Sequence, residues 1–142
     1  MGRDIRYLTV SEIVEIHMMI MRDYGEGEQA GVMFPDRLES ASERPKAVFF
    51  EKELYPTIWD KAACLLQSII QEHIFHNGNK RTGLACMEIF LMLNGYQFRM
   101  RNGDTEEFIV NIAMSSEYKG KEGVSNMSQV IQSFTIPISL NR

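Results

Sequence analysis

The sequence is poor in the residues that mark several protein classes. It has two cysteines and four prolines in 142 residues, and Cys64 and Cys86 form no Cys-x-x-Cys pair. Both cysteines lie in apolar helical patterns, which favours buried, reduced thiols over a disulfide or a metal pair. The low proline content, with 44% hydrophobic residues, excludes a disordered or collagen-like chain. We therefore expect a folded protein in a reducing, cytosolic (cytoplasmic) compartment.

Long hydrophobic runs are also missing. The most apolar stretch, residues 84–93, is interrupted by Glu88 and is far shorter than the roughly 20 residues that span a bilayer. No apolar segment follows the first residues, Met1-Gly2-Arg3-Asp4. We therefore expect neither secretion nor a membrane location.

A basic excess is absent as well. The chain has 15 Lys and Arg against 19 Asp and Glu, a formal net charge of −4. Proteins that coat nucleic acids normally carry an excess of positive charge, because they neutralise phosphates. Direct binding of nucleic acid by this chain alone is therefore not expected. The acidic excess lies in residues 1–60, whereas residues 61–142 have eight basic and seven acidic residues.

Helical patterns dominate the sequence. Thr9 and Glu12 have the spacing of a capping box, and a helix is predicted from there to a stop at Gly25. Residues 25–34 are predicted to be a loop. A short helix is predicted at residues 35–43, and a long helix is predicted to have Pro56 in its first turn. Further helices are predicted at residues 79–94, at 104–116 after a capping box of Asp104 and Glu107, and at 125–134. Strand-like segments are predicted at 47–50 and 96–100, with an extended tail at 135–140. The prediction is one mainly α domain, residues 1–142, with a small β-hairpin.

The most informative segment is residues 73–82, His-Ile-Phe-His-Asn-Gly-Asn-Lys-Arg-Thr. Gly78 permits a backbone conformation closed to other residues, and Asn79 is predicted to cap the next helix, whose first N–H groups carry partial positive charge. Lys80 and Arg81 add two cations, and no acidic residue occurs in the sequence between residues 72 and 88. The pattern predicts an anion cradle suited to a polyphosphate.

His73 is predicted to accept a proton. It ends a helical face that also carries Ile58, Ala62, Leu65 and Ile69, and a neutral imidazole there could take the proton of an attacking hydroxyl during phosphoryl transfer. Phe75 is predicted to anchor the loop by burying its ring. Each residue alone also has a structural explanation: a core histidine, a turn-and-cap pair, solvated cations. The ten-residue arrangement as a whole favours a functional site.

The segment resembles the Fic/Doc signature His-x-Phe-x-(Asp/Glu/Asn)-Gly-Asn-(Gly/Lys)-Arg, and it matches at His73, Phe75, Gly78, Asn79 and Arg81. The flanks are similar too, at the following positions: Tyr7-Leu8-Thr9, Tyr55-Pro56, Lys61-Ala62-Ala63, Thr82 and Asn94-Gly95-Tyr96. The similarity covers about residues 5–115, and the opening is similar to Doc-type (death-on-curing) toxins.

The resemblance implies a compact helical Fic/Doc fold that uses ATP and Mg²⁺ to modify a hydroxyl side chain of a target protein. It implies that His73 is the general base and that Gly78, Asn79, Lys80 and Arg81 hold phosphates. Residues 44–53 would correspond to the flap that aligns the target by strand-like pairing. Within that flap, the residues expected to bind the target are Lys46, Ala47 and Val48.

Departures from the signature bear on the chemistry. Lys80 stands where adenylylating Fic enzymes usually have Gly, and Leu84 stands where they have a second Arg. Both match the Doc subgroup, which transfers the γ-phosphoryl group, so a protein kinase is favoured over a Fic-type adenylyltransferase (AMPylation). Asn77 replaces a frequent acidic residue and offers Mg²⁺ only an uncharged oxygen. A catalytically weak or inactive partner-binding module is therefore a second alternative.

Two histidines outside the signature positions have plain explanations. His73 and His76 have the spacing of a metal pair, but no further ligands occur at useful spacing, so His76 is interpreted as an exposed loop residue. His17 lies among Met18, Met19 and Met21, which are interpreted as core filler, with a partner-binding groove as the alternative.

An internal inhibitory helix is not convincing. The family's inhibitory motif is (Ser/Thr)-x-x-x-Glu-(Gly/Asn); Ser11 and Glu15 have its spacing, but Ile16 follows. This favours a separate antitoxin whose disordered segment folds into a groove on the chain. The sequence thus predicts a bacterial Doc-like toxin of a toxin–antitoxin pair, acting as a protein kinase on a cytosolic protein substrate. The resemblance suggests a translation factor as that substrate.

Overall fold

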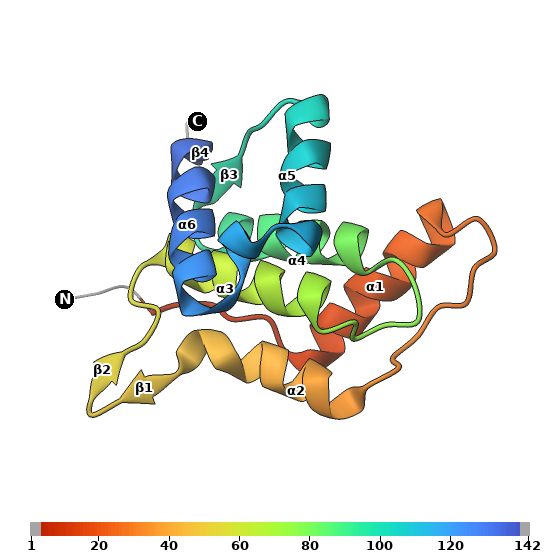
Figure 1. Cartoon of the computed structure of the whole chain (residues 1–142), viewed down its shortest axis with the longest axis horizontal. Coiled ribbons are helices and arrows are strands. Elements are labelled where there is room, and N and C mark those ends of the chain that lie inside the picture. The colour runs from red at the N-terminus through yellow and green to blue at the C-terminus, as the bar shows by residue number, and fades with distance from the viewer. Residues whose placement is uncertain (1–3, 140–142) are drawn as a thin grey trace.

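The computed structural model describes residues 4–139, and the fold in this part of the chain is mainly helical (Figure 1). The helices are α1 (Val10–Tyr24), α2 (Pro35–Glu43), α3 (Ile58–Gln71), α4 (Asn79–Leu93), α5 (Asn102–Met114) and α6 (Gly120–Ser133). Two short antiparallel pairs join β1 (Val48–Phe49) to β2 (Lys52–Glu53) and β3 (Tyr96–Phe98) to β4 (Thr135–Pro137). The predicted compact, mainly α domain with a small hairpin is confirmed.

Helix α3 forms the centre of the molecule. Every residue from Lys61 to Ile70 is buried, which is the pattern of a helix enclosed on all sides. It packs against α2, α4, α5 and α6, and Figure 1 shows it crossing the middle of the fold. Helix α4 buries only one face, and Gly83 on that face lets it approach α3 closely: a Cβ there would lie 3.1 Å from Ile70 Cγ1. The signature loop is therefore held between two helices packed at close range.

Two predicted helix starts are wrong. Thr57 accepts from the Asp60 N–H at 3.0 Å and forms a capping box with it, so α3 begins after Pro56 rather than at it. Helix α5 begins at Asn102 after Arg101, and Asp104 pairs with Arg101 at 3.3 Å instead of capping. The Thr57 side chain thus caps α3, whereas no side chain among the described residues caps α5.

Helix α6 begins earlier than predicted. It starts at Gly120 rather than near residue 125, although glycines disfavour helix by about 1 kcal/mol each. Gly123, Val124 and Met127 are buried, so packing overrides the local propensity. Part of the predicted tail pairs with β3 as β4, and Leu140 of that tail lies outside the described residues.

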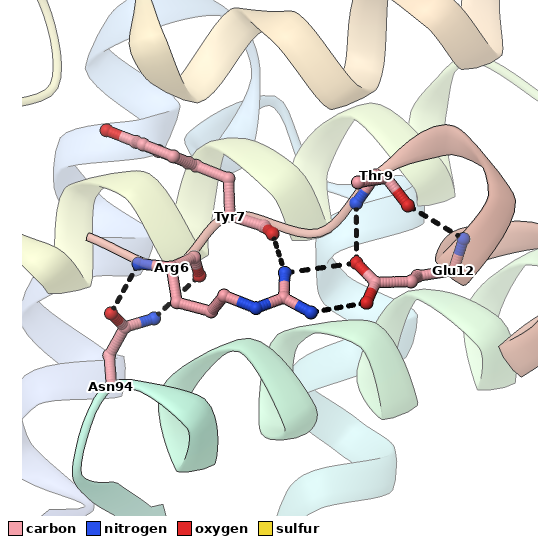
Figure 2. Close-up of polar contacts among 5 residues, drawn as sticks. All are labelled: Arg6, Tyr7, Thr9, Glu12 and Asn94. Carbon is pink, nitrogen blue, oxygen red and sulfur yellow. Dashed lines mark hydrogen bonds and ion pairs between the residues drawn. The ribbon is translucent and has the colours of Figure 1, made fainter. Parts of the chain in front are cut away.

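The segment before α1 is tied down by polar contacts (Figure 2). The Asn94 side chain accepts from the Arg6 N–H at 2.9 Å and donates to the Arg6 carbonyl at 3.0 Å. The Arg6 guanidinium donates to the Tyr7 carbonyl and to both Glu12 oxygens. Glu12 and Thr9 satisfy each other's backbone N–H groups, so the predicted capping box is confirmed. These bonds fix how α1 enters the fold.

The Glu12 pair predicts a stability change in acid. Hydrogen bonds from Arg6 and from the Thr9 backbone lower the pKa of Glu12 from 4.5 to about 2. The unfolded chain therefore takes up the proton first as the pH falls, and the stabilisation present above pH 4.5 is lost on the way down to about pH 2. Because the pair is exposed to solvent, we expect less than about 1 kcal/mol.

The measurement compares urea midpoints at pH ~5.5 and ~3 for the wild type and Glu12→Gln, which keeps an oxygen for the Thr9 N–H. The two proteins should differ at the higher pH, and the difference should be clearly smaller at the lower one. A constant difference at both pH values would contradict the assignment.

The hairpin β1–β2 confirms the predicted strand-like segment. Its turn residues Phe50 and Glu51 have φ of 50° and 65°, as a tight two-residue hairpin turn requires. Buried Lys61 holds its base, donating to Glu53 Oε1 at 2.6 Å and to the Tyr55 carbonyl at 2.5 Å. Figure 1 shows the hairpin at one end of the long axis, with the α3–α4 loop toward the other. The hairpin is therefore an exposed arm.

The two cysteines are fully buried and unpaired, as predicted. Burial raises the pKa of Cys64 to about 11 and that of Cys86 to about 12. Their thiols therefore stay protonated at neutral pH and make poor nucleophiles. No helix within residues 4–139 is long and apolar enough to cross a membrane.

Candidate active site

A cleft of about 950 Å³ opens beside the loop that joins α3 to α4. The end of α1, the loop itself, the adjoining parts of α3 and α4, and residues along the length of α5 line it. Among the lining residues are His73, Asn77, Gly78, Asn79, Lys80 and Arg81. Phe75 lies beneath the loop with 1% of its surface exposed. The structure thus brings the predicted base and the predicted phosphate-binding residues to one cavity.

His73 is not the last residue of a buried helical face. Ala62, Leu65 and Ile69 are buried as predicted, but α3 ends at Gln71, and His73 is exposed with φ of 51°. A left-handed residue just past a helix turns the chain away from the helix axis. The correction favours catalysis, because the imidazole lies at the cleft, where a substrate hydroxyl can reach it.

Gly78 has the backbone conformation that was predicted at the start of α4, whereas the predicted cap by Asn79 is wrong. Gly78 is the residue before the helix, with φ of 75°, and a Cβ there would lie 2.6 Å from Met21 Sδ. Asn79 is the first helical residue and does not cap it. Its side chain accepts from the Phe75 N–H and donates to the Phe75 carbonyl, both at 2.9 Å. Asn79 therefore closes the loop on itself.

That arrangement leaves the amino end of α4 open to the cleft. The N–H groups of Asn79, Lys80 and Arg81 have no acceptor among residues 4–139, and a helix start with free N–H groups attracts anions. Arg81 donates to the Tyr24 carbonyl at 3.1 Å and lies 4.9 Å over the Tyr24 ring. In this described part of the chain, neither Lys80 nor Arg81 forms an ion pair.

Two carboxylates that sequence order hides also line the cleft. Glu28, in the loop after α1, and Glu106, on α5, both border it. Both lie far along the chain from the basic pair, so a scan for nearby acids could not find them. Although the sequence between residues 72 and 88 has no acidic residue, the cleft that this segment borders does contain carboxylates.

Asn77 offers an oxygen for a metal ion. Its Nδ2 donates to the Gln29 carbonyl at 3.0 Å, which fixes the amide, and Oδ1 accepts no hydrogen bond from the described residues. Mg²⁺ prefers oxygen ligands and takes several of them from phosphates and water. Residues 4–139 contain no group of three or more His, Cys, Asp or Glu placed to hold a metal ion. The site fits an ion bound through one amide oxygen and a nucleotide's phosphates.

A family model described as the Fic/DOC family matches residues 7–91, more than half of the chain. The chain belongs to the Fic/DOC family. The matched region includes the loop from His73 to Thr82, the whole of α3 and all but the last two residues of α4.

Two curated Fic/DOC relatives carry informative names. "Toxin Doc" of Mycolicibacterium smegmatis is 39% identical over 90 residues, which cover 63% of this chain and 61% of that protein. "Protein kinase doc" of Escherichia phage P1 is 29% identical over 93 residues, 66% of this chain and 71% of that protein. The match thus spans less than two thirds of the first relative.

The strand-like segment beside this Fic/DOC loop is not the predicted one. Residues 31–34 run along residues 74–76: Val32 pairs with Phe75, and the N–H groups of Met33 and Phe34 donate to the Ile74 carbonyl at 2.8 and 3.1 Å. Residues 25–34 were predicted only as a loop. Long-range pairing of this kind leaves no local sequence signal.

The predicted flap, residues 44–53, does not border the cleft. None of its residues, Lys46, Ala47 and Val48 included, lines the cavity. Lys46 pairs with Glu43 at 3.3 Å, and Val48 is 59% exposed in β1. The predicted hairpin forms, but the length of α3 separates it from the Fic/DOC loop.

The methionines around His17 were interpreted as core filler, and this is confirmed for Met21 but wrong for Met18 and Met19. Met21 is buried, but Met18 and Met19 are 48% and 39% exposed. His17 itself is fully buried and contacts Thr82, Gly31 and Phe75. It therefore belongs to the support of the Fic/DOC loop.

Proposed function

We propose that this chain is a Doc-type toxin that transfers the γ-phosphoryl group of ATP to a hydroxyl side chain of a protein. The observation that carries the proposal is one cleft holding an exposed His73 beside the open amino end of α4. Membership of the Fic/DOC family and the names of the relatives, "Toxin Doc" and "Protein kinase doc", support it.

The signature residues that line the cleft have defined tasks in this proposal. The N–H groups of residues 79–81 and the cations of Lys80 and Arg81 hold the phosphates, since such contacts favour oxygen anions. Asn77 supplies an oxygen to Mg²⁺, which neutralises phosphate charge when bound. His73 takes the proton of the target hydroxyl.

The bonds, electrons and proton of the transfer are all accounted for by ATP, the target hydroxyl and His73. The hydroxyl oxygen forms a bond to the γ-phosphorus as the bond from that phosphorus to the β–γ bridging oxygen breaks. ADP leaves with the electron pair of that bond, and His73 holds the proton. Catalysis here consists of positioning and charge stabilisation, as is general for phosphoryl transfer.

The cleft favours phosphorylation over adenylylation. Leu84 lines it where adenylylating Fic enzymes usually place a second Arg, so the cation that would orient an α-phosphate is replaced by an apolar side chain. Lys80 instead adds a charge at the start of α4, where the terminal phosphates are proposed to bind. Adenylylation by the same His73 remains the competing outcome for the test.

Labelled ATP separates the two reactions and also tests a purely binding role. The protein is incubated with Mg²⁺, a bacterial extract and ATP labelled at either the α- or the γ-phosphate, with boiled protein as the blank. We expect γ-label on a protein band and no α-label. Transfer of α-label would establish adenylylation, and no transfer of either label would support the inactive, partner-binding alternative.

The proposal extends to the setting of the protein. As a single domain (residues 1–142) in the bacterial cytoplasm, the toxin would be held in check by a cognate antitoxin that folds onto it. Its protein substrate would be part of the translation machinery. Co-expression with the adjacent reading frame tests the first point: growth should be restored by the antitoxin and not by an empty vector.

A further inference from the structure

Four separate segments of the chain meet at His17. Its side chain comes from α1 and is fully buried. Nδ1 lies 3.0 Å from Thr82 Oγ1 on α4, and the Gly31 N–H donates to Nε2 at 3.0 Å. The ring stacks on Phe75 with 3.8 Å between centroids and 11° between planes. One imidazole therefore joins α1, the segment 31–34, the signature loop and α4.

These contacts define a single state of the ring. Because the Gly31 N–H donates to Nε2, that nitrogen carries the lone pair, so the proton is on Nδ1 and is donated to Thr82 Oγ1. Burial, and to a smaller extent the charge of His76, lower the pKa of His17 to about 4. His17 is therefore neutral, with one tautomer, at the pH where His73 acts as a base.

The two ends of the signature loop are the parts that His17 holds. Phe75 follows His73 by two residues, and Thr82 follows Arg81 directly. The carbonyl of Gly31 in turn accepts from the His76 N–H at 3.0 Å. Loss of the ring contacts would release the loop at both ends, although His17, Gly31, Phe75 and Thr82 do not line the substrate cleft.

We propose that His17 is a positioning residue: it keeps His73 and the phosphate-binding N–H groups in one geometry toward a shared substrate. This inference rests on the proposed phosphoryl transfer. A misplacement of the reacting groups by about 1 Å costs up to 100-fold in rate. The loss of a side chain that never touches ATP can therefore lower turnover strongly.

The test separates positioning from packing. His17→Phe keeps a ring on Phe75 and removes both hydrogen bonds, and Thr82→Val removes one of them from the other side. Met127→Ala is the matched control, because Met127 is fully buried in α6, is not part of the cleft, and its truncation costs about 2–5 kcal/mol of stability. Measurements are the free energy of unfolding, kcat, KM for ATP, and exchange of the Phe75 and His76 amides.

We expect His17→Phe to lower kcat about 10- to 100-fold and to change KM for ATP less than about threefold. Thr82→Val should lower kcat in the same direction, and the double variant should lose less than the product of the two effects. Met127→Ala should keep kcat within about twofold below its unfolding temperature. A kcat of His17→Phe equal to that of the wild type or of Met127→Ala would overturn the proposal.

Amide exchange distinguishes failure of this inference from failure of the proposed function. Loss of the ring contacts should speed exchange at Phe75 and His76 about tenfold or more, whatever reaction the cleft performs. If the wild type transfers no phosphate, the proposed function fails and exchange alone decides whether His17 positions the loop. Unchanged exchange rates in His17→Phe, or in Thr82→Val should His17→Phe not fold, overturn the positioning role.

Discussion

Replacing His73 should reduce phosphoryl transfer by about 10²- to 10⁴-fold, the usual contribution of a general base. The sharper variant is His73→Asn. Asparagine tolerates the left-handed backbone, in which His73 has φ of 51°, and it cannot accept the hydroxyl proton at neutral pH. The loop should therefore keep its shape while the base is lost. The measurement is the initial rate of γ-label transfer, together with ATP affinity by calorimetry.

The neighbouring histidine provides the control for this variant. His76 lines the same cleft, and its hydrogen bond to the Gly31 carbonyl uses the backbone N–H rather than the ring. His76→Ala should therefore leave the rate of transfer within about threefold of the wild type, because it removes no side chain that the proposed reaction uses. Equal losses in both variants, or full activity in His73→Asn, would show that His73 is not the base.

Replacing Asn79 with Asp should weaken ATP binding by about 100-fold. The carboxylate can still accept from the Phe75 N–H, but it has no N–H for the Phe75 carbonyl, to which Asn79 donates at 2.9 Å. Two oxygens would then face each other, and a negative charge would lie where phosphates are proposed to bind. A lost bond of this kind costs about 1–3 kcal/mol, and charge repulsion adds to it. Calorimetric titration with ATP measures the effect.

Asn102→Asp is the matched control for that charge. Asn102 borders the same cleft at the start of α5 and has no hydrogen bond to the loop among the described residues. The Asn102→Asp variant adds the same charge to the cavity without altering the hydrogen bonds between Asn79 and Phe75. Its effect on ATP affinity should be at least tenfold smaller than that of Asn79→Asp, because water screens exposed charges. Equal effects would indicate that bulk charge rather than loop closure governs binding.

Features set by neighbouring residues could be predicted from the sequence. The capping box of Thr9 and Glu12 and the bounds of the helix at Pro35–Glu43 needed only caps and prolines, which act over three or four residues. The clustering of residues 73–82 at one site was also predictable, because they are contiguous. The candidate site residues could be named from the sequence because they are neighbours along the chain.

Features set by long-range contacts could not be predicted. The buried role of His17 depends on Thr82 and Gly31, and the pairing of residues 31–34 with 74–76 joins segments that lie about 40 residues apart in the sequence. The exposure of His73 follows from one left-handed residue, which helical periodicity does not anticipate. The hairpin's distance from the cleft follows from the length of α3, which no motif records.

The Arg81 side chain has a reduced conformational freedom before any ligand binds. Its guanidinium donates to the Tyr24 carbonyl and lies over the Tyr24 ring, so the side chain is ordered before any nucleotide arrives. Freezing a long, flexible side chain costs up to about 1.5–2 kcal/mol, and here that cost falls on folding rather than on association. An arginine free in solvent at the same position would subtract it from the affinity. If Arg81 holds phosphates as proposed, Tyr24 would thus contribute to the affinity for ATP without contacting a phosphate itself.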